Sequence, residues 1–200
     1  MGDTTLYPIY PRVFMPSAFA HGLVGASLVS LLPRGGRTGR VALVLAALAA
    51  APDLDVLAFR LGIPYAHPLG HRGASHSLAF GVLAGLASLP FWRLGRSPRP
   101  GLLALLTGIS VVSHGLLDTL TNAGLGVGLL IPFENGRYFA PWRPILTSPL
   151  SPGAFFSARG LEILGNEALW VGAPVLVLLL LAAGIRGAWG VLRGARGAAG

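Results

Sequence analysis

Five apolar stretches constrain this chain more than any other feature of its sequence. They run over residues 18–32, 41–59, 76–92, 101–120 and 168–185. A helix needs about 20 residues, and at least about 17, to cross the hydrocarbon core of a bilayer. The last four stretches meet this length, and the first is short. The pattern predicts an all-α, polytopic membrane helical bundle with about five transmembrane helices.

One domain is expected to hold all of these helices. It covers residues 1–185, and a flexible basic tail follows over residues 186–200. The chain is 53% hydrophobic and only 11% charged, whereas soluble domains carry about 25% charged residues. It has no cysteine, so disulfides and thiolate ligands are excluded.

The net charge is +8, and all of the Lys+Arg residues are arginines. They form short clusters between the apolar stretches, which is typical of residues that flank membrane helices and not of a nucleic-acid-binding face. The clusters are Arg34, Arg37 and Arg40, then Arg93, Arg96 and Arg99, then Arg186, Arg193 and Arg196. With five crossings they share one side. The positive-inside rule assigns that side to the cytoplasm, with the N-terminus outside and the C-terminus inside.

Most of the few histidines and acidic residues lie within or beside the apolar stretches. They are His21, Asp53, Asp55, His71, His76, His114, Asp118 and Glu167. A charge at mid-membrane costs about 2.5–3.5 kcal/mol, so these groups must offset one another or bind something. At 1.5 Å per residue, those on four helices lie about 20–26 Å from the arginine clusters. The sequence therefore predicts one polar layer in the outer half of the membrane.

Two pairs in this set have the spacing of metal ligands. His114 and Asp118 are four residues apart on one helix face, a half-site for zinc or a similar ion; a hydrogen bond between packed helices is the alternative. Asp53 and Asp55 follow Pro52, and two carboxylates so close repel unless a cation lies between them. A solvated helix end is the alternative for that pair.

The remaining candidates are open to two interpretations each. His71 and His76 bracket the segment H-R-G-A-S-H-S, in which Arg72 is a candidate anion clamp or a partner of lipid phosphate. His21 is a ligand or an interfacial histidine. Glu167 is a general base or an acid that suits a helix N-terminus.

The order of these motifs resembles the YdjM-type family of inner-membrane proteins regarded as metal-dependent hydrolases. The matching pieces are H-G-L-V-G from His21, P-D-L-D from Pro52, H-R-G-A-S-H-S from His71, S-H-G-L-L-D-T-L-T from Ser113, and the segment from Phe155. The family is in turn distantly similar to zinc-dependent phospholipase C and related all-α nucleases, which hold two or three zinc ions.

The resemblance implies a site and a location. His114 and Asp118 correspond to the H-x-x-x-D pair of those enzymes, and Asp53, one of His71 or His76, and His21 take further metal roles. No histidine follows His114, so one or two ions are expected and not three. The expected location is the plasma (inner) membrane.

These observations favour a membrane-bound metal-dependent hydrolase with a divalent ion, zinc being the expected one. The expected substrate is a phosphoester of a lipid or lipid-linked molecule at the outer leaflet. Asp55 or Glu167 is expected to act as general base, and Arg72 to bind the substrate's anionic group. Membrane lipid is the expected partner, and nucleic acid is not. The alternatives are an ion or proton transporter and a non-catalytic scaffold stapled by the metal.

Overall fold

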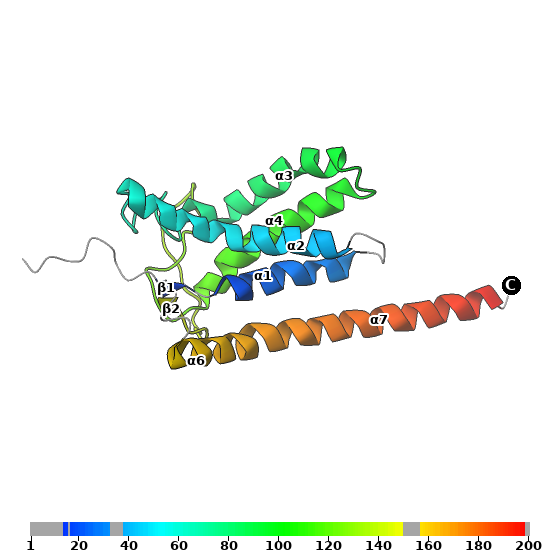
Figure 1. Ribbon diagram of the computed structural model, residues 1–200. Helices are drawn as coiled ribbons and strands as arrows, with labels where there is room; N and C mark the ends of the chain where they lie inside the picture. Colours follow the sequence, from blue (N-terminus) through cyan, green and yellow to red (C-terminus); the bar gives the residue numbers. More distant parts are fainter. Residues whose placement is uncertain (1–13, 16, 33–37, 150–156, 199–200) are drawn as a thin grey trace, which may run out of the picture.

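The computed structural model describes residues 14–15, 17–32, 38–149 and 157–198, which form a helical bundle with one short pair of antiparallel strands. Figure 1 shows α1 to α4 side by side, with α6 and α7 forming one rod along their flank. The elements are β1 (Phe14–Met15), α1 (Ala18–Ser27), η1 (Leu28–Leu31), α2 (Thr38–Ala50), η2 (Ala51–Leu61), η3 (Ala74–His76), α3 (Leu78–Leu94), α4 (Pro100–Thr119), β2 (Ser148–Pro149), α6 (Ala158–Glu167), η4 (Ala168–Gly172) and α7 (Ala173–Ala198). Here η1 to η3 are 3-10 helices and η4 is a π-helix.

Three helical rods in the described part of the chain are long and apolar enough to cross a membrane. They cover Thr38–Leu61, Pro100–Thr119 and Ala158–Trp189. Two shorter apolar helices, Ala18–Leu31 and Leu78–Leu94, accompany them. The described residues thus confirm the predicted all-α membrane bundle.

The rod Thr38–Leu61 changes its winding at Pro52. The α-helix ends at Ala50, and the chain continues as a 3-10 helix to Leu61, with Pro52 in its first turn. Proline has no backbone N–H and its ring clashes with the preceding turn, so a regular α-helix cannot run through it. The two aspartates that follow Pro52 therefore project from a helix of tighter pitch.

Glycines bring α3 and α4 close together. A Cβ on Gly81 would lie 2.3 Å from Val112 Cγ2, and one on Gly85 would lie 2.9 Å from the Ala104 carbonyl oxygen. Small residues at such positions allow membrane helices to pack backbone to backbone. This contact also holds η3, which directly precedes α3, against the end of α4.

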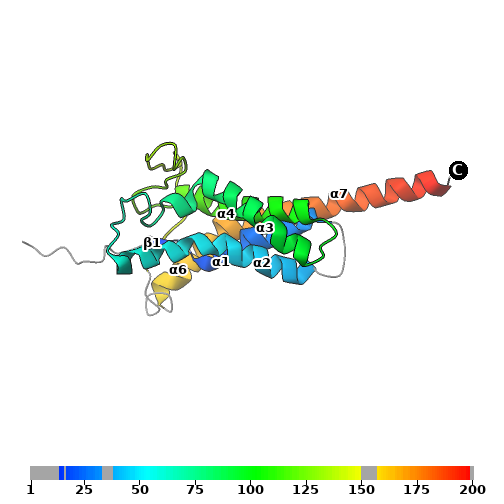
Figure 2. The same cartoon turned by 90° about the horizontal axis from the view of Figure 1, so that it is seen from above.

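The last rod begins earlier and ends later than the sequence predicts. Helix α6 starts at Ala158, within the expected long connection, and α7 runs to Ala198 through most of the expected flexible tail. Figure 2 shows α7 projecting beyond the other helices. A nucleated helix adds further residues at little cost, and the alanines and arginines of residues 186–198 favour the extension while the four glycines there oppose it. Residues 199 and 200 lie outside the described part.

The described arginines of the three clusters lie at the end of the bundle opposite to β1 and β2. Arg40 is near the start of α2, Arg93 is in the last turn of α3, and Arg99 caps the start of α4. These helix ends lie together on the right of Figure 1. Arg34 and Arg37 are outside the described residues.

We predict that this arginine-bearing end faces the cytoplasm. Reporter fusions after residue 36 and after residue 145 should therefore report opposite sides of the membrane, the first cytoplasmic and the second external. A pair of fusions that report the same side would show that the predicted topology is wrong.

Candidate metal centre

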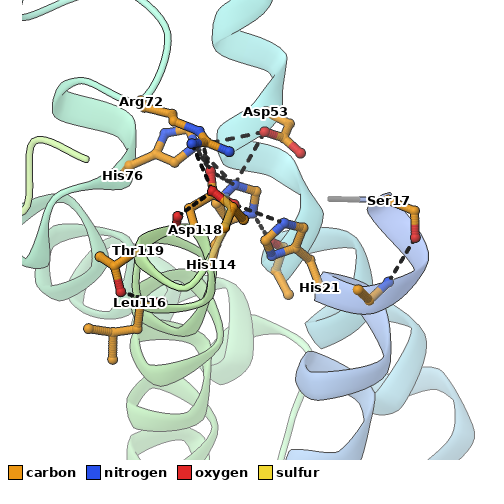
Figure 3. Close-up of polar contacts among 12 residues, drawn as sticks. Ser17, His21, Asp53, Arg72, His76, His114, Leu116, Asp118 and Thr119 are labelled. Carbon is orange, nitrogen blue, oxygen red and sulfur yellow. Dashed lines mark hydrogen bonds and ion pairs between the residues drawn. The ribbon is translucent and has the colours of Figure 1, made fainter. Parts of the chain in front are cut away.

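Four elements bring histidines and aspartates together at the end of the bundle away from the arginines. His21 comes from the first turn of α1, Asp53 from η2, His76 from η3, and His114 and Asp118 from the last turns of α4. Figure 3 shows these side chains pointing toward one another. His21, His114 and Asp118 are fully buried, while the Asp53 side chain keeps 13% of its exposure.

Asp53, His76, His114 and Asp118 each offer one ligand atom to a common point, and we call them the four-ligand centre. His114 Nε2 lies 2.9 Å from His76 Nε2 and 3.3 Å from Asp53 Oδ1. His76 Nε2 lies 3.5 Å from Asp118 Oδ2 and 3.7 Å from Asp53 Oδ1. Tetrahedral ligands bound at about 2.0–2.2 Å stand about 3.3–3.6 Å apart. Most of these separations lie near that range, and the 2.9 Å between the two imidazole nitrogens would have to widen for both to bind one divalent ion.

Hydrogen bonds turn the Nε2 lone pairs of both imidazoles toward that point. His114 Nδ1 lies 2.7 Å from the Ala49 carbonyl oxygen, which can only accept, so Nδ1 carries the proton. His76 Nδ1 lies 3.0 Å from Ser75 Oγ and 3.1 Å from Asp55 Oδ2, and because the Ser75 hydroxyl donates to Asp55, both oxygens accept from Nδ1. With both imidazoles neutral, two bare Nε2 lone pairs face each other at 2.9 Å, and a proton on one of them or a metal ion between them would relieve this repulsion. This arrangement calls for a cation, and oriented histidines of this kind are typical metal ligands.

The local sequence explains why the Ala49 carbonyl is available to His114. In a 3-10 turn a carbonyl accepts from the N–H three residues later, which for Ala49 is Pro52. Proline has no N–H to donate. The proline that ends α2 thus also supplies an acceptor that sets the tautomer of a candidate ligand on α4.

Arg72 is fully buried and pairs with Asp118. Its Nε lies 2.9 Å from Asp118 Oδ2, and its Nη1 donates to Thr121 Oγ1 at 3.0 Å and to the Ala123 carbonyl at 2.8 Å. The backbone of Arg72 has φ +58°, an uncommon conformation for a residue with a side chain. An anion clamp needs an accessible guanidinium, and here the guanidinium serves Asp118. The role of Arg72 toward a substrate stays a prediction.

The charges at this end of the bundle favour a divalent cation. Three carboxylates, those of Asp53, Asp55 and Asp118, lie here with the buried guanidinium of Arg72, which pairs with Asp118, so these four groups leave two negative charges when the histidines are neutral. Buried charge without compensation is costly. One divalent ion would balance it.

His21 and His71 lie beside the four-ligand centre. His21 stacks on His114 with ring centroids 3.7 Å apart, and its Nε2 lies 3.4 Å from Asp118 Oδ1. His71 Nδ1 lies 2.6 Å from Asp55 Oδ1. Asp55, His71 and His76 form a second group of possible ligands. The structure thus brings all six predicted ligands to one place, and four of them share a point.

Glu167 is held by the start of α1. Its carboxylate accepts from the Ser17 backbone N–H at 2.5 Å and from the Ser17 hydroxyl. Ser17 is the N-cap of α1, so this contact ties the last rod to the helix that carries His21. Glu167 belongs to neither group of possible ligands in the described residues. Its role as a general base stays a prediction.

Arg137, which no sequence pattern marks, joins the connection after α4 to the segment that carries His71. Its guanidinium donates to the carbonyl oxygens of Tyr65 at 2.8 Å, His71 at 3.0 Å, His67 at 3.1 Å and Gly126 at 3.4 Å. The segment that carries His71 is thereby held to the connection that follows α4. His67 is exposed and contributes its backbone to this contact.

Tyr65 is a second residue that sequence reasoning missed. A Cβ on Gly124 would come within 2.8 Å of both the Tyr65 hydroxyl and Arg72 Nη1, which explains a glycine there, at φ +98°. Burial raises the pKa of the Tyr65 phenol. The phenol therefore keeps its proton at neutral pH and remains a donor beside Arg72.

Gly115, which separates the centre's two residues on α4, allows η3 to approach that helix. A Cβ there would lie 2.2 Å from the His76 carbonyl oxygen. We predict that Gly115→Ala destabilises the protein by about 1–3 kcal/mol, as overpacked sites do, and weakens metal binding because His76 is pushed from His114.

Gly101→Ala is the matched control on the same helix, because nothing lies within 4 Å of its Cβ. Denaturation in detergent and metal titration of both variants check the prediction. Equal behaviour of the two variants would contradict it.

Comparison with known proteins supports the membrane character of this centre. The model of the YdjM inner membrane protein family matches residues 15–190. Inner membrane protein YbcI of Escherichia coli K12 is 38% identical over 134 residues, which cover 66% of this chain and 76% of that protein. No solved structure matches the chain significantly.

Proposed function

This chain belongs to the YdjM family of inner membrane proteins, and from that premise and the four-ligand centre we propose that it is a membrane-bound metal-dependent hydrolase. The observation that carries the proposal is the convergence of two imidazole lone pairs and two carboxylates on one buried point. Nitrogen and carboxylate donors at these separations suit zinc. The proposed substrate is a phosphoester of a lipid or lipid-linked molecule in the outer leaflet.

The ion, when bound, supplies a Lewis acid that polarises the phosphoryl oxygen and lowers the pKa of a water ligand to about 7. The chain's own residues would hold the ion and orient its ligands. His76 and His114 present Nε2 because Asp55 and Ala49 accept at Nδ1. Arg72 holds Asp118 in place through the carboxylate oxygen that also faces His76.

Four protein ligands close a tetrahedral site unless the ion takes a fifth ligand, and Asp53 marks the side on which water or substrate would enter as that ligand. Structural zinc sites are closed, whereas catalytic sites keep a position for water or substrate. Within the four-ligand centre, Asp53 has the most exposed side chain at 13%, while the other three are buried. Substrate would therefore approach from η2.

A transporter is less favoured, because the other half of the bundle is apolar. The core there consists of Leu45, Trp92, Leu103, Ala104 and Leu106, whereas a path through the membrane needs polar groups at several depths. A metal-stapled scaffold is the stronger alternative. Near-complete burial of the ligands and their origin on three elements favour it.

Turnover by purified protein separates enzyme from scaffold. Protein in detergent with added zinc is incubated with a panel of lipid phosphoesters, and release of phosphate or headgroup is measured. The parent should hydrolyse at least one class, and His114→Ala should lose both metal and turnover. A parent that binds metal fully but hydrolyses nothing on the panel would leave the scaffold as the function.

A further inference from the structure

Asp55 holds two histidines at once. Its Oδ1 accepts from His71 Nδ1 at 2.6 Å. Its Oδ2 accepts from the Ser75 hydroxyl at 2.6 Å and from the Arg72 backbone N–H at 3.1 Å, and it also lies 3.1 Å from His76 Nδ1. Four donors from one short segment of chain therefore converge on this carboxylate.

One of these donors reaches Oδ1 and three reach Oδ2, so hydrogen bonds from this segment use Oδ2 fully and bind Oδ1 to His71. We infer that Asp55 is a positioning residue that orients His76, and that the centre takes one ion, with His71 outside its coordination sphere. The inference rests on the metal centre of the proposed function and deepens it by assigning the ion count.

A second ion held through His71 Nδ1 and Asp55 Oδ1 fits the distances poorly. The 2.6 Å between His71 Nδ1 and Asp55 Oδ1 is the length of a short hydrogen bond. Two ligands of one zinc-like ion would stand about 3.3–3.6 Å apart. His76 Nδ1 must also keep its proton toward Asp55, which leaves only its Nε2 for the four-ligand centre.

His21 does not provide a second position either. Its Nε2 lies 3.4 Å from Asp118 Oδ1, an oxygen of a residue already in the four-ligand centre. In the described residues His21 belongs to neither group of possible ligands. His21 is better placed to pack against His114, on which it stacks.

The positioning role of Asp55 predicts that its replacement lowers the metal affinity without abolishing metal binding. Carboxylates that orient ligating histidines contribute about 10–100-fold to metal affinity. Asp55→Asn keeps the shape but removes the charge and one acceptor, so His76 remains a ligand with lower basicity. Replacement of a true ligand, as in His76→Ala, removes one of four bonds to the ion.

The test is metal stoichiometry and cobalt spectroscopy on the full chain in detergent. We expect the parent and His71→Ala to bind one zinc ion each by elemental analysis. Asp55→Asn should also bind one ion, about 10–100-fold more weakly. Its Co²⁺ form should show shifted visible bands that keep tetrahedral intensity. Glu162→Gln, which removes an exposed carboxylate that pairs with Arg159, is the control and should match the parent.

Two ions in the parent and one in His71→Ala would overturn the inference, as would an Asp55→Asn variant with parental affinity and an unchanged cobalt spectrum. A parent that binds no metal would overturn both the inference and the proposed function. One bound ion without turnover on phosphoesters would support the inference and count against the hydrolase alone.

Discussion

Asp118→Asn is expected to abolish metal binding and, with it, any metal-dependent turnover. Asparagine keeps nearly the same shape but cannot supply the negative charge that balances a divalent ion in a buried site. Carboxylates that orient a ligand without touching the ion contribute about 10–100-fold to metal affinity. Loss of a carboxylate that binds the ion directly should therefore lower the affinity by more than about 100-fold. The variant also strands the Arg72 cation, which is fully buried. Breaking one partner of a buried pair costs about 3–5 kcal/mol.

Asp53→Asn is the matched control that separates the loss of metal binding from the loss of stability. Asp53 belongs to the same four-ligand centre, but its recorded ion-pair contacts are with histidines and its side chain is 13% exposed. We expect it to lose metal with a smaller loss of stability than Asp118→Asn. Isothermal titration with zinc and chemical denaturation of the metal-free proteins provide the two readouts. An Asp118→Asn protein that binds zinc with parental affinity would remove Asp118 from the centre.

Arg72→Ala should destabilise the metal-free protein by about 3–5 kcal/mol and yet retain the ion. The stability is lost because Asp118, fully buried, keeps its charge without its partner. A divalent ion can replace the missing positive charge. Added zinc should therefore restore much of the lost stability, since a ligand that binds only the folded state stabilises it by mass action.

The control for Arg72 is Arg159→Ala, which breaks an ion pair whose side chains are 51% and 56% exposed. Such surface pairs contribute little, so the denaturation midpoint should hardly move. Kinetics on a hydrolysed phosphoester test the anion-clamp role of Arg72. A raised KM with unchanged kcat would indicate lost substrate binding. Loss of zinc from folded Arg72→Ala would instead show that this guanidinium maintains the coordination of Asp118.

Part of the site could be predicted because helix geometry converts sequence spacing into depth. The rise of about 1.5 Å per residue places residues equally far from the arginine clusters in one layer. His21, Asp53, His76 and His114 are indeed brought together at one end of the bundle. The four-residue spacing of His114 and Asp118 puts both on one face of α4, although their ligand atoms remain 3.9 Å apart.

The sequence by itself determined that the chain is a membrane bundle with a polar layer at one level. The hydropathy of each stretch and the rise per residue of a helix are local properties, which is why they can be read without the fold. Only the tertiary structure decided which side chains of that layer contact one another. Spacing along a helix gives depth but not rotation about the helix axis, and rotation is set by packing such as the glycine contacts of α3 and α4. Asp55 therefore meets two histidines, Glu167 meets Ser17, and Arg72 turns inward to Asp118, because contacts between distant segments outweigh what each segment prefers alone.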